Sequence, residues 1–163
     1  MLELLGNLGD FIGGVAVVVT IGYLAVQIRS QTIANRRSTF QDLLNHQADL
    51  NLAWMTNPEL GDVIIGGRDQ SLEEMDQKTR SLLTTHTTMS LRHGQNAYSQ
   101  FLEKAITKEQ LSQLEMPLYA TLGAPYAQRL WDLLKSRFPE DFRTYVDEEL
   151  MPVAKSSDGW NVR

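Results

Sequence analysis

The sequence contains no cysteine. Disulfide bonds, thiol nucleophiles and cysteine metal sites are therefore excluded, and the composition fits a reducing cytoplasm. The net charge is −5, whereas a nucleic-acid-binding protein would need a clustered basic face. We therefore expect no nucleic-acid partner. The sequence also has no internal repeat, low-complexity tract or long linker.

The sequence also lacks the short motifs that accompany common catalytic sites. It has no Gly-x-Ser-x-Gly turn, no phosphate-binding glycine loop and no Gly-x-Gly-x-x-Gly segment. No Glu-x-x-His motif of the kind used in diiron bundles is present. We predict a non-enzymatic protein with no catalytic residues, no bound metal and no cofactor.

Positive charge is missing from the first part of the chain, because all 15 lysines and arginines lie at or after Arg29. Residues 11–28 (FIGGVAVVVTIGYLAVQI) contain no charged side chain at all. As a helix they would extend about 27 Å, close to the ~30 Å hydrocarbon core of a bilayer. The alternative is a buried strand or core helix of a soluble protein, but a strand of this length would be unusually long. We predict a transmembrane helix within a membrane anchor of residues 1–28.

The charge asymmetry also predicts how this helix is oriented. Arg29, Arg36 and Arg37 follow the apolar segment directly, and no carboxylate lies between Asp10 and Asp42. The positive-inside rule then places the N-terminus outside and the C-terminal domain in the cytoplasm. A cleaved signal peptide is disfavoured, because no positive residue precedes the segment and no Ala-x-Ala site ends it. We predict a single-pass protein of the bacterial inner (plasma) membrane, whose three arginines can also contact anionic headgroups.

The remainder of the chain reads as all-α. Residues 31–56 contain neither Gly nor Pro, so the transmembrane helix should continue into a long stalk helix of about 45 residues in total. About five shorter helices should pack against it, over residues 58–66, 71–104, 107–122, 125–138 and 139–150. Their boundaries come from proline positions, the Ser71/Glu74 capping box, Thr107 and the Met151-Pro152 pair. We predict a cytoplasmic helical domain at 29–151 and a C-terminal tail at 152–163, loosely held unless Trp160 docks.

The stalk carries a heptad pattern of apolar residues, interrupted by polar ones. The seam is formed by Ile33, Phe40, Leu43, Gln47, Leu50 and Trp54. Such a seam predicts packing against another helix along the stalk.

Four segments together resemble a known protein family: GDFIGGVAVVVTIGYLAVQIR, NPEL, HGQNAYSQF and RLWDLLKSRFPEDFRTYVDE. They are similar to a widespread, uncharacterised bacterial family of small proteins with a Gly-rich N-terminal transmembrane helix and a cytoplasmic helical domain. The resemblance extends over nearly the whole chain. It implies the same architecture, and it implies no activity, cofactor or catalytic residue.

The three histidines are the best candidates for a polar site. His86 and His93 are seven residues apart and should share a helix face about 10 Å apart, too far for one metal ion. If the stalk packs on that helix, His46 can meet His86 and form a polar layer with Gln47, Asn96 and Gln100. A possible polar pocket is therefore expected at His46, His86, His93 and Asn96. The simpler interpretation is that these histidines are buried or interfacial and are satisfied by their neighbours.

Small residues follow one side of the apolar helix at spacings of three and four. These are Gly6, Gly9, Gly13, Ala16 and Thr20. Small residues allow helix backbones to approach closely in lipid, so the stripe predicts membrane helix association. Ordinary glycine enrichment of membrane helices is the alternative.

These patterns favour an accessory subunit of a membrane complex or a self-associating scaffold. Its partners would be membrane lipid and either itself or another integral membrane protein. Two alternatives remain open. One is a ligand sensor or enzyme that uses the polar pocket, and the other is an oligomeric pore lined by Thr20 and Gln27.

Overall fold

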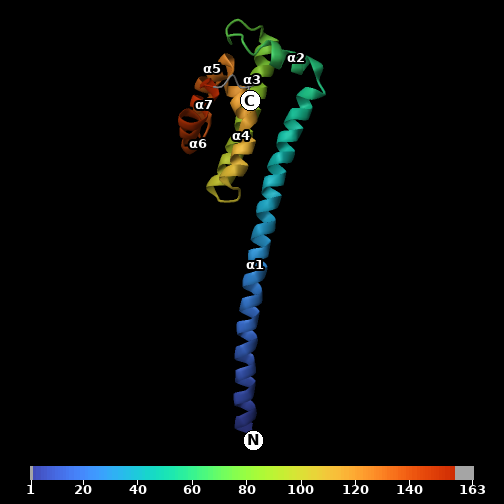
Figure 1. Cartoon of the computed structure of the whole chain (residues 1–163), viewed down its shortest axis with the longest axis vertical. Helices are drawn as coiled ribbons and strands as arrows, with labels where there is room; N and C mark the ends of the chain where they lie inside the picture. The colour runs from blue at the N-terminus through green and yellow to red at the C-terminus, as the bar shows by residue number, and fades with distance from the viewer. Residues whose placement is uncertain (1, 157–163) are drawn as a thin grey trace. The chain divides into compact units, whose positions relative to one another are not determined.

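The structure is a computed structural model that describes the backbone of residues 2–156 and the surroundings of the side chains from residue 13 onward. This part of the chain consists of helices joined by short turns, with no strand (Figure 1). The predicted all-α class is therefore confirmed. The chain divides into two compact units, Met1–Ser38 and Thr39–Arg163.

Helix α1 (Leu2–Met55) has 54 residues and contains the whole predicted anchor and stalk. It begins earlier than expected and ends as predicted, just before the Asn57-Pro58 pair. Its Gly13–Met55 portion is long and apolar enough to cross a membrane. From residue 13 to residue 38 every side chain is exposed. Among the described residues, α1 is therefore the one helix that could span a membrane, and it lies near the N-terminus.

Helix α2 (Pro58–Gly66) follows the predicted boundaries. The Asn57 side chain accepts a hydrogen bond from the Leu60 N–H at 3.3 Å, and Pro58 occupies the first turn. Both residues are typical of a helix start, because the first N–H groups of a helix lack partners within it.

Helix α3 (Gln77–Leu102) begins later than the Ser71/Glu74 motif predicts. The motif does form a contact, since the Ser71 N–H donates to the Glu74 carboxylate at 3.2 Å. However, residues 71–75 form a turn and not a helix, and Leu72 and Met75 are buried within it. The actual cap is Asp76, whose carboxylate accepts from two backbone N–H groups.

The end of α3 also differs from the predicted Lys104. Lys104 has a φ angle of 59°, a left-handed conformation that cannot continue a right-handed helix. The helix therefore ends at Leu102.

Helix α4 (Lys108–Leu122) begins with the reciprocal capping box of Thr107 and Gln110. It retains Pro117 within its length. Helix α5 (Pro125–Leu134) passes into a short 3-10 turn, η1 (Lys135–Arg137). The predicted helix of 125–138 is thus four residues too long. Its last residues form the 3-10 turn, and Phe138 has an extended backbone because it precedes Pro139.

The last helical segment comprises α6 (Glu140–Tyr145), the π-helical turn η2 (Val146–Leu150) and α7 (Met151–Ser156). The prediction that Met151-Pro152 ends this helix is wrong. Proline lacks the N–H of an ordinary helical hydrogen bond, but Met151 and Ala154 are buried. We attribute the continuation to this burial, which offsets the lost bond. The remaining tail residues, 157–163 with Trp160, lie outside the described part.

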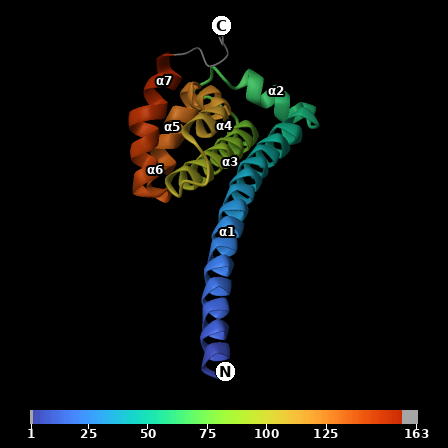
Figure 2. The same cartoon turned by 60° about the horizontal axis from the view of Figure 1, so that its bottom comes forward.

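The main core of the second unit lies where α5, α6 and α7 meet α3 and α4 (Figure 2). Its largest fully buried side chains are Trp131 and Phe142, whose rings meet edge to face. The Trp131 indole donates to Asp147 at 2.6 Å, so its polar atom is also satisfied.

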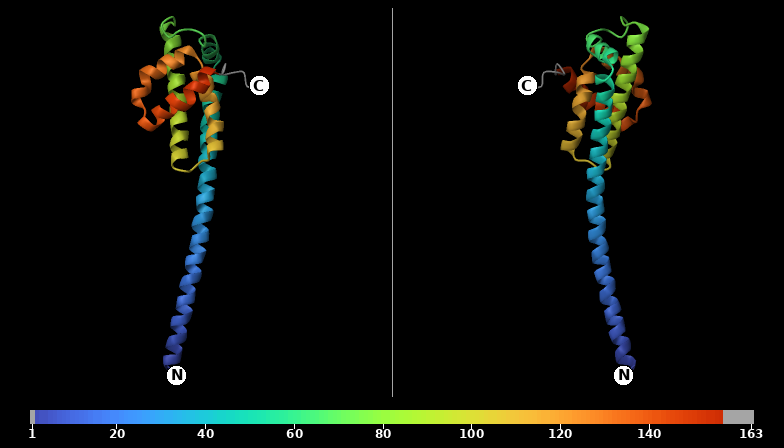
Figure 3. Two further views of the ribbon diagram at one scale, coloured as in Figure 1. Left: turned by 60° about the vertical axis from the view of Figure 1, so that its left-hand side comes forward. Right: turned by 90° about the vertical axis from the view of Figure 1, so that its right-hand side faces the viewer.

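A second cluster joins residues 39–55 of α1 to the domain. Leu43 packs with Ala97 of α3 and Leu114 of α4. Figure 3 shows this part of α1 running beside α3 and α4. The predicted stalk seam is thereby used within the second unit, and it forms one wall of the cavity described next.

Candidate functional site

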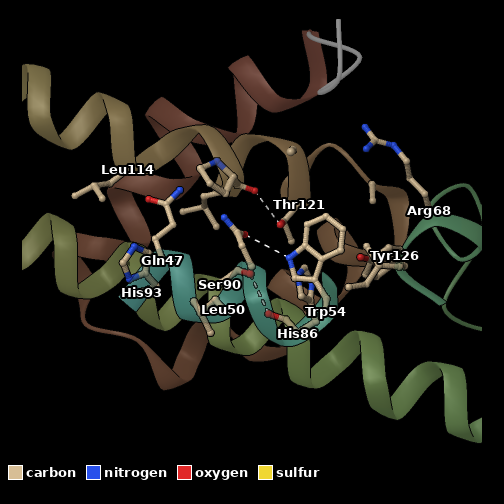
Figure 4. Close-up of a pocket in the computed structure, with 16 residues that line it drawn as sticks. Gln47, Leu50, Trp54, Arg68, His86, Ser90, His93, Leu114, Thr121 and Tyr126 are labelled. Carbon is tan, nitrogen blue, oxygen red and sulfur yellow. Dashed lines mark hydrogen bonds between the residues drawn. The ribbon is translucent and has the colours of Figure 1, made fainter. Parts of the chain in front are cut away.

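A cavity of about 200 Å³, partly open to solvent, lies within the second unit and is lined by residues of α1, α2 and the turn after it, α3, α4 and the start of α5. Leu50, Ile64, Leu114 and Leu118 make much of its wall apolar. Figure 4 shows the side chains around it, with Gln47 and His93 on one side of the view and Arg68 and Tyr126 on the other. A mostly apolar cavity with a few polar groups is the usual form of a small-molecule site.

His93 is the most unusual residue of this cavity. Its side chain is only 6% exposed, and neither ring nitrogen has a hydrogen-bond partner. His86, two turns earlier on α3, also lines the cavity and has a buried Nδ1 atom without a partner. Most buried polar atoms in proteins are paired. These imidazoles therefore offer unused hydrogen-bonding capacity to anything that enters the cavity.

Burial also sets the protonation state of both histidines. Desolvation lowers the pKa of His86, and burial together with the neighbouring His46 lowers the pKa of His93. Both side chains are therefore neutral at pH 7. A neutral imidazole has one nitrogen that donates and one that accepts, so the cavity presents both kinds of group without a charge.

The other polar side chains of the cavity differ in whether their polar atoms have hydrogen-bond partners. The Oε1 atom of Gln47 is buried without a partner. In contrast, Trp54 Nε1 donates to Asn51 Oδ1 at 3.3 Å. The hydroxyl groups of Ser90 and Thr121 donate to backbone carbonyls of their own helices. The buried cavity atoms without a partner are thus Gln47 Oε1, His86 Nδ1 and the two ring nitrogens of His93.

The structure places only two of the four predicted pocket residues at the cavity, His86 and His93. His46 is exposed and outside the cavity wall, although its ring centroid lies 5.3 Å from that of His93. The expected contact of His46 with His86 is replaced by this contact with His93. Asn96 is exposed and does not line the cavity. Its assignment to the pocket is corrected, because Asn96 lies on the next turn of α3, about 60° around the helix from His93, and is exposed there.

Several cavity residues could not be identified from the sequence. Trp54 is predicted only as part of the stalk seam, Arg68 only as part of the turn that ends helix 58–66, and Tyr126 has no distinguishing pattern around it. Burial raises the pKa of Tyr126, opposed by the nearby Thr87 hydroxyl and Arg68 charge. One sequence feature points to the polar side of the cavity: a stalk seam that contains Gln47 requires a polar counterpart on the facing helix.

A second buried polar group lies apart from the cavity and was also missed. Glu115 is 7% exposed and accepts hydrogen bonds from the hydroxyls of Tyr119 and Tyr145. Burial raises the pKa of Glu115, and burial beside this carboxyl raises the pKa of Tyr119 to about 12. Tyr145 also stacks on Tyr98 at 4.0 Å. This group joins α3, α4 and α6, and we interpret it as structural.

The exposed apolar segment of α1 contributes the other set of candidate residues. Gly13, Ala16 and Thr20 are exposed, and no atom lies within 4 Å of a Cβ built on Gly13. Gly6 and Gly9 lie outside the residues whose surroundings are described. The Thr20 hydroxyl donates to the Ala16 carbonyl at 2.8 Å, which satisfies it within the helix. Arg29, Arg36 and Arg37 are exposed, as are all their neighbours in the first unit from residue 13 onward.

Comparison with protein families, curated proteins and solved structures finds no match to this chain. The resemblance to a bacterial membrane-anchored family therefore stays a prediction. Among residues 13–156, no three His, Asp or Glu side chains are grouped so that they could hold a metal ion. The candidate features are thus the exposed apolar helix and the cavity around His93.

Proposed function

We propose that this protein is a non-enzymatic, single-pass component of the bacterial inner membrane, with its N-terminus outside and its helical domain in the cytoplasm. The observation that carries the proposal is the uniform exposure of residues 13–28 of α1, an apolar segment without a charge. Soluble proteins rarely expose a continuous apolar surface of this kind. A lipid bilayer removes that surface from water.

The polar groups of this segment fit the same environment. In lipid every backbone polar group must be satisfied internally, and a helix meets this requirement. The Thr20 hydroxyl is also bonded within the helix. Arg29, Arg36 and Arg37 follow the apolar segment and favour a cytoplasmic location for the domain.

We further propose that the helix associates with a second copy or with another membrane protein, as a scaffold or accessory subunit. Gly13, Ala16 and Thr20 are exposed, and no described atom lies within 4 Å of a Cβ built on Gly13. The stripe continues through Gly9 and Gly6 in the sequence. Such stripes allow close helix contact, with van der Waals packing as the main source of stability.

The association is tested by native mass spectrometry of the full chain released from its membrane. Gly9→Leu/Gly13→Leu should reduce the oligomer or the copurifying partner by about tenfold, since a loss of ~1.4 kcal/mol has this effect. Val18→Leu is the matched control, because Val18 lies on the opposite side of the helix and is exposed. An unchanged assembly in the glycine variant would exclude this interface.

A second candidate function is favoured by the cavity. A cytoplasmic domain with unpaired imidazole nitrogens in an apolar cavity is suited to bind a small molecule. Gln47, Leu50 and Trp54 of α1 line this cavity. Ligand binding would therefore contact the same helix that carries the membrane segment, as a membrane-bound sensor requires.

A further inference from the structure

We propose that the cavity around His93 binds a small, neutral aromatic alcohol of the phenol class. Its ring would lie against the apolar wall, and its hydroxyl would bond to the unpaired atoms of His93 and Gln47. This inference rests on the second function proposed above, ligand sensing. It adds the chemical class of the ligand and the residues that recognise it.

The polar end of the cavity favours a ligand that carries a hydroxyl group. His93 supplies one donor and one acceptor, and Gln47 supplies a buried acceptor, none of them paired within the protein. A hydroxyl both donates and accepts, so it can satisfy one group of each kind. A carboxylate only accepts, and it would leave the acceptor atoms of His93 and Gln47 unpaired in a buried place, which is unfavourable.

The apolar walls and the volume of the cavity favour a ligand with one aromatic ring. The cavity measures about 200 Å³ and is lined by Leu50, Trp54, Leu118 and Tyr126 among others. An apolar protein cavity of about 150 Å³ is known to accept benzene. Aromatic rings also pack favourably against other rings at an offset or edge to face. A single substituted ring therefore fits both the volume and the surface.

The charges of the cavity exclude a cationic ligand. No Asp or Glu lines it, and Arg68 is its one lysine or arginine side chain among residues 13–156. His86 and His93 are neutral, because burial lowers the pKa of both. An ammonium group would enter without a counter-charge, at a large desolvation cost. Arg68 makes an anionic ring compound the competing class, which the experiment has to separate.

The experiment follows the imidazole nitrogens directly. The chain has only three histidines, so full-length protein labelled with ¹⁵N-histidine in lipid nanodiscs gives three imidazoles to assign. Phenol, toluene, benzoate and benzylamine are titrated separately at pH 7. Ring nitrogen shifts of His93 report hydrogen bonding at the site, whereas partition into lipid does not move them in a saturable way.

Phenol should shift the His93 nitrogens with saturation and bind ~3- to 10-fold more tightly than toluene, the range expected for one net hydrogen bond. The His93→Leu variant should lose this preference, with binding followed at His86. Asn96→Ala is the matched control, since Asn96 is exposed on the same helix, and it should bind phenol like the unmodified chain. Ala120→Phe, which fills the cavity, should abolish the shifts while circular dichroism stays helical.

Other outcomes would overturn the inference at different levels. Tighter binding of benzoate or benzylamine would contradict the phenol class but leave a ligand site. Equal binding of phenol and toluene would exclude the hydroxyl contact with His93. No saturable shift with any probe would mean a cavity filled only by water, and it would also remove the sensing function. None of these outcomes bears on the membrane anchor or its association.

Discussion

His93 has an unusual environment for a histidine, buried with both ring nitrogens unpaired and with His46 close by. Its surroundings disfavour the charged form by desolvation and by the proximity of a second imidazole. His86 experiences the first of these effects. The two residues therefore connect the stability of the domain to pH in a defined direction.

We predict that the unfolding free energy decreases as the pH falls below about 6.5, the ordinary histidine pKa that applies in the unfolded chain. Because the folded pKa of each histidine is lower, the unfolded state binds more protons in this range, and acid favours it. The measurement is chemical unfolding in detergent between pH 7.5 and pH 5.5, followed by circular dichroism.

The His93→Leu variant provides the comparison for this pH dependence. Its unfolding free energy should fall less steeply over the same range, because one of the two titrating groups is gone. A slope identical to that of the unmodified chain would contradict a lowered pKa at His93. Glu115 acts in the opposite direction at more acid pH, since its folded pKa is raised and its contribution decreases as the pH rises through that pKa.

For individual residues, the sequence allowed part of the cavity lining to be predicted. Helical spacing places His86 and His93 on one face, and both line the cavity. Asn96 could not be separated from them by spacing, because a residue three positions from His93 lies near the same face, and only the packing of the other helices leaves it exposed. Glu115 could not be recognised, because an acidic residue at an apolar helix position looks the same whether it is solvated or paired with distant tyrosines.

Some helix boundaries are set by residues close in sequence, and others depend on tertiary packing. Asn57-Pro58 and Thr107 were predicted correctly, because a cap depends on atoms within four residues. The Ser71/Glu74 motif was interpreted incorrectly, because Asp76 lies close behind it and caps α3 instead. The Met151-Pro152 pair was also interpreted incorrectly, because Met151 and Ala154 are buried and tertiary packing outweighs a local signal there.

The turn after α2 gives a prediction about helix packing. A Cβ atom on Gly67 would lie 2.7 Å from Leu83 Cδ1 and 2.8 Å from the Val63 carbonyl oxygen. Leu83 is fully buried on α3. We expect Gly67→Ala to lower the unfolding free energy by about 1–3 kcal/mol, the usual cost of overpacking a core.

Gly66→Ala is the adjacent control for this substitution. A Cβ atom at Gly66 has no neighbour within 4 Å, so no loss of stability is expected there. The two variants are compared by urea unfolding under the same conditions. Equal stability of the two would show that α2 and α3 do not approach as closely at Gly67 as described.

For the whole molecule, the main feature is the contrast between its two units. The first exposes every side chain from residue 13 to residue 38, whereas the second buries a core of its own. The apolar segment and the all-α class could be predicted from composition and periodicity. The identity of a partner for the first unit could not be predicted, because a stripe of small residues favours close helix contact without specifying which helix makes it.

We predict that the arginines after the apolar segment determine its orientation. Replacing Arg29, Arg36 and Arg37 by Glu should place the domain outside in a large fraction of molecules, since lysine and arginine near the membrane direct topology. Because the chain has no cysteine, Ser112→Cys adds a single reporter thiol at an exposed position. An impermeant maleimide added to spheroplasts then labels only domains that lie outside.

The control for the orientation experiment is a variant with the same change in net charge at three positions far from the apolar segment. Lys104, Lys108 and Arg137 are exposed and distant in sequence from the apolar segment, and their replacement by Glu should leave Ser112→Cys protected. Labelling of the reporter in the otherwise unmodified chain would reverse the proposed orientation. Recovery of the protein in the soluble fraction would exclude the anchor itself.

The π-helical turn η2 has a consequence for how this chain tolerates changes in length. Its closing hydrogen bond joins the Met151 N–H to the Val146 carbonyl, five residues back instead of four. One additional residue is thus accommodated within an otherwise regular helix. Deleting a single residue there would restore ordinary winding and leave Met151 and Ala154 on their buried face. A deletion elsewhere in the same helical segment would instead rotate everything after it by about 100°, so η2 is the place where this segment can lose one residue without losing its packing.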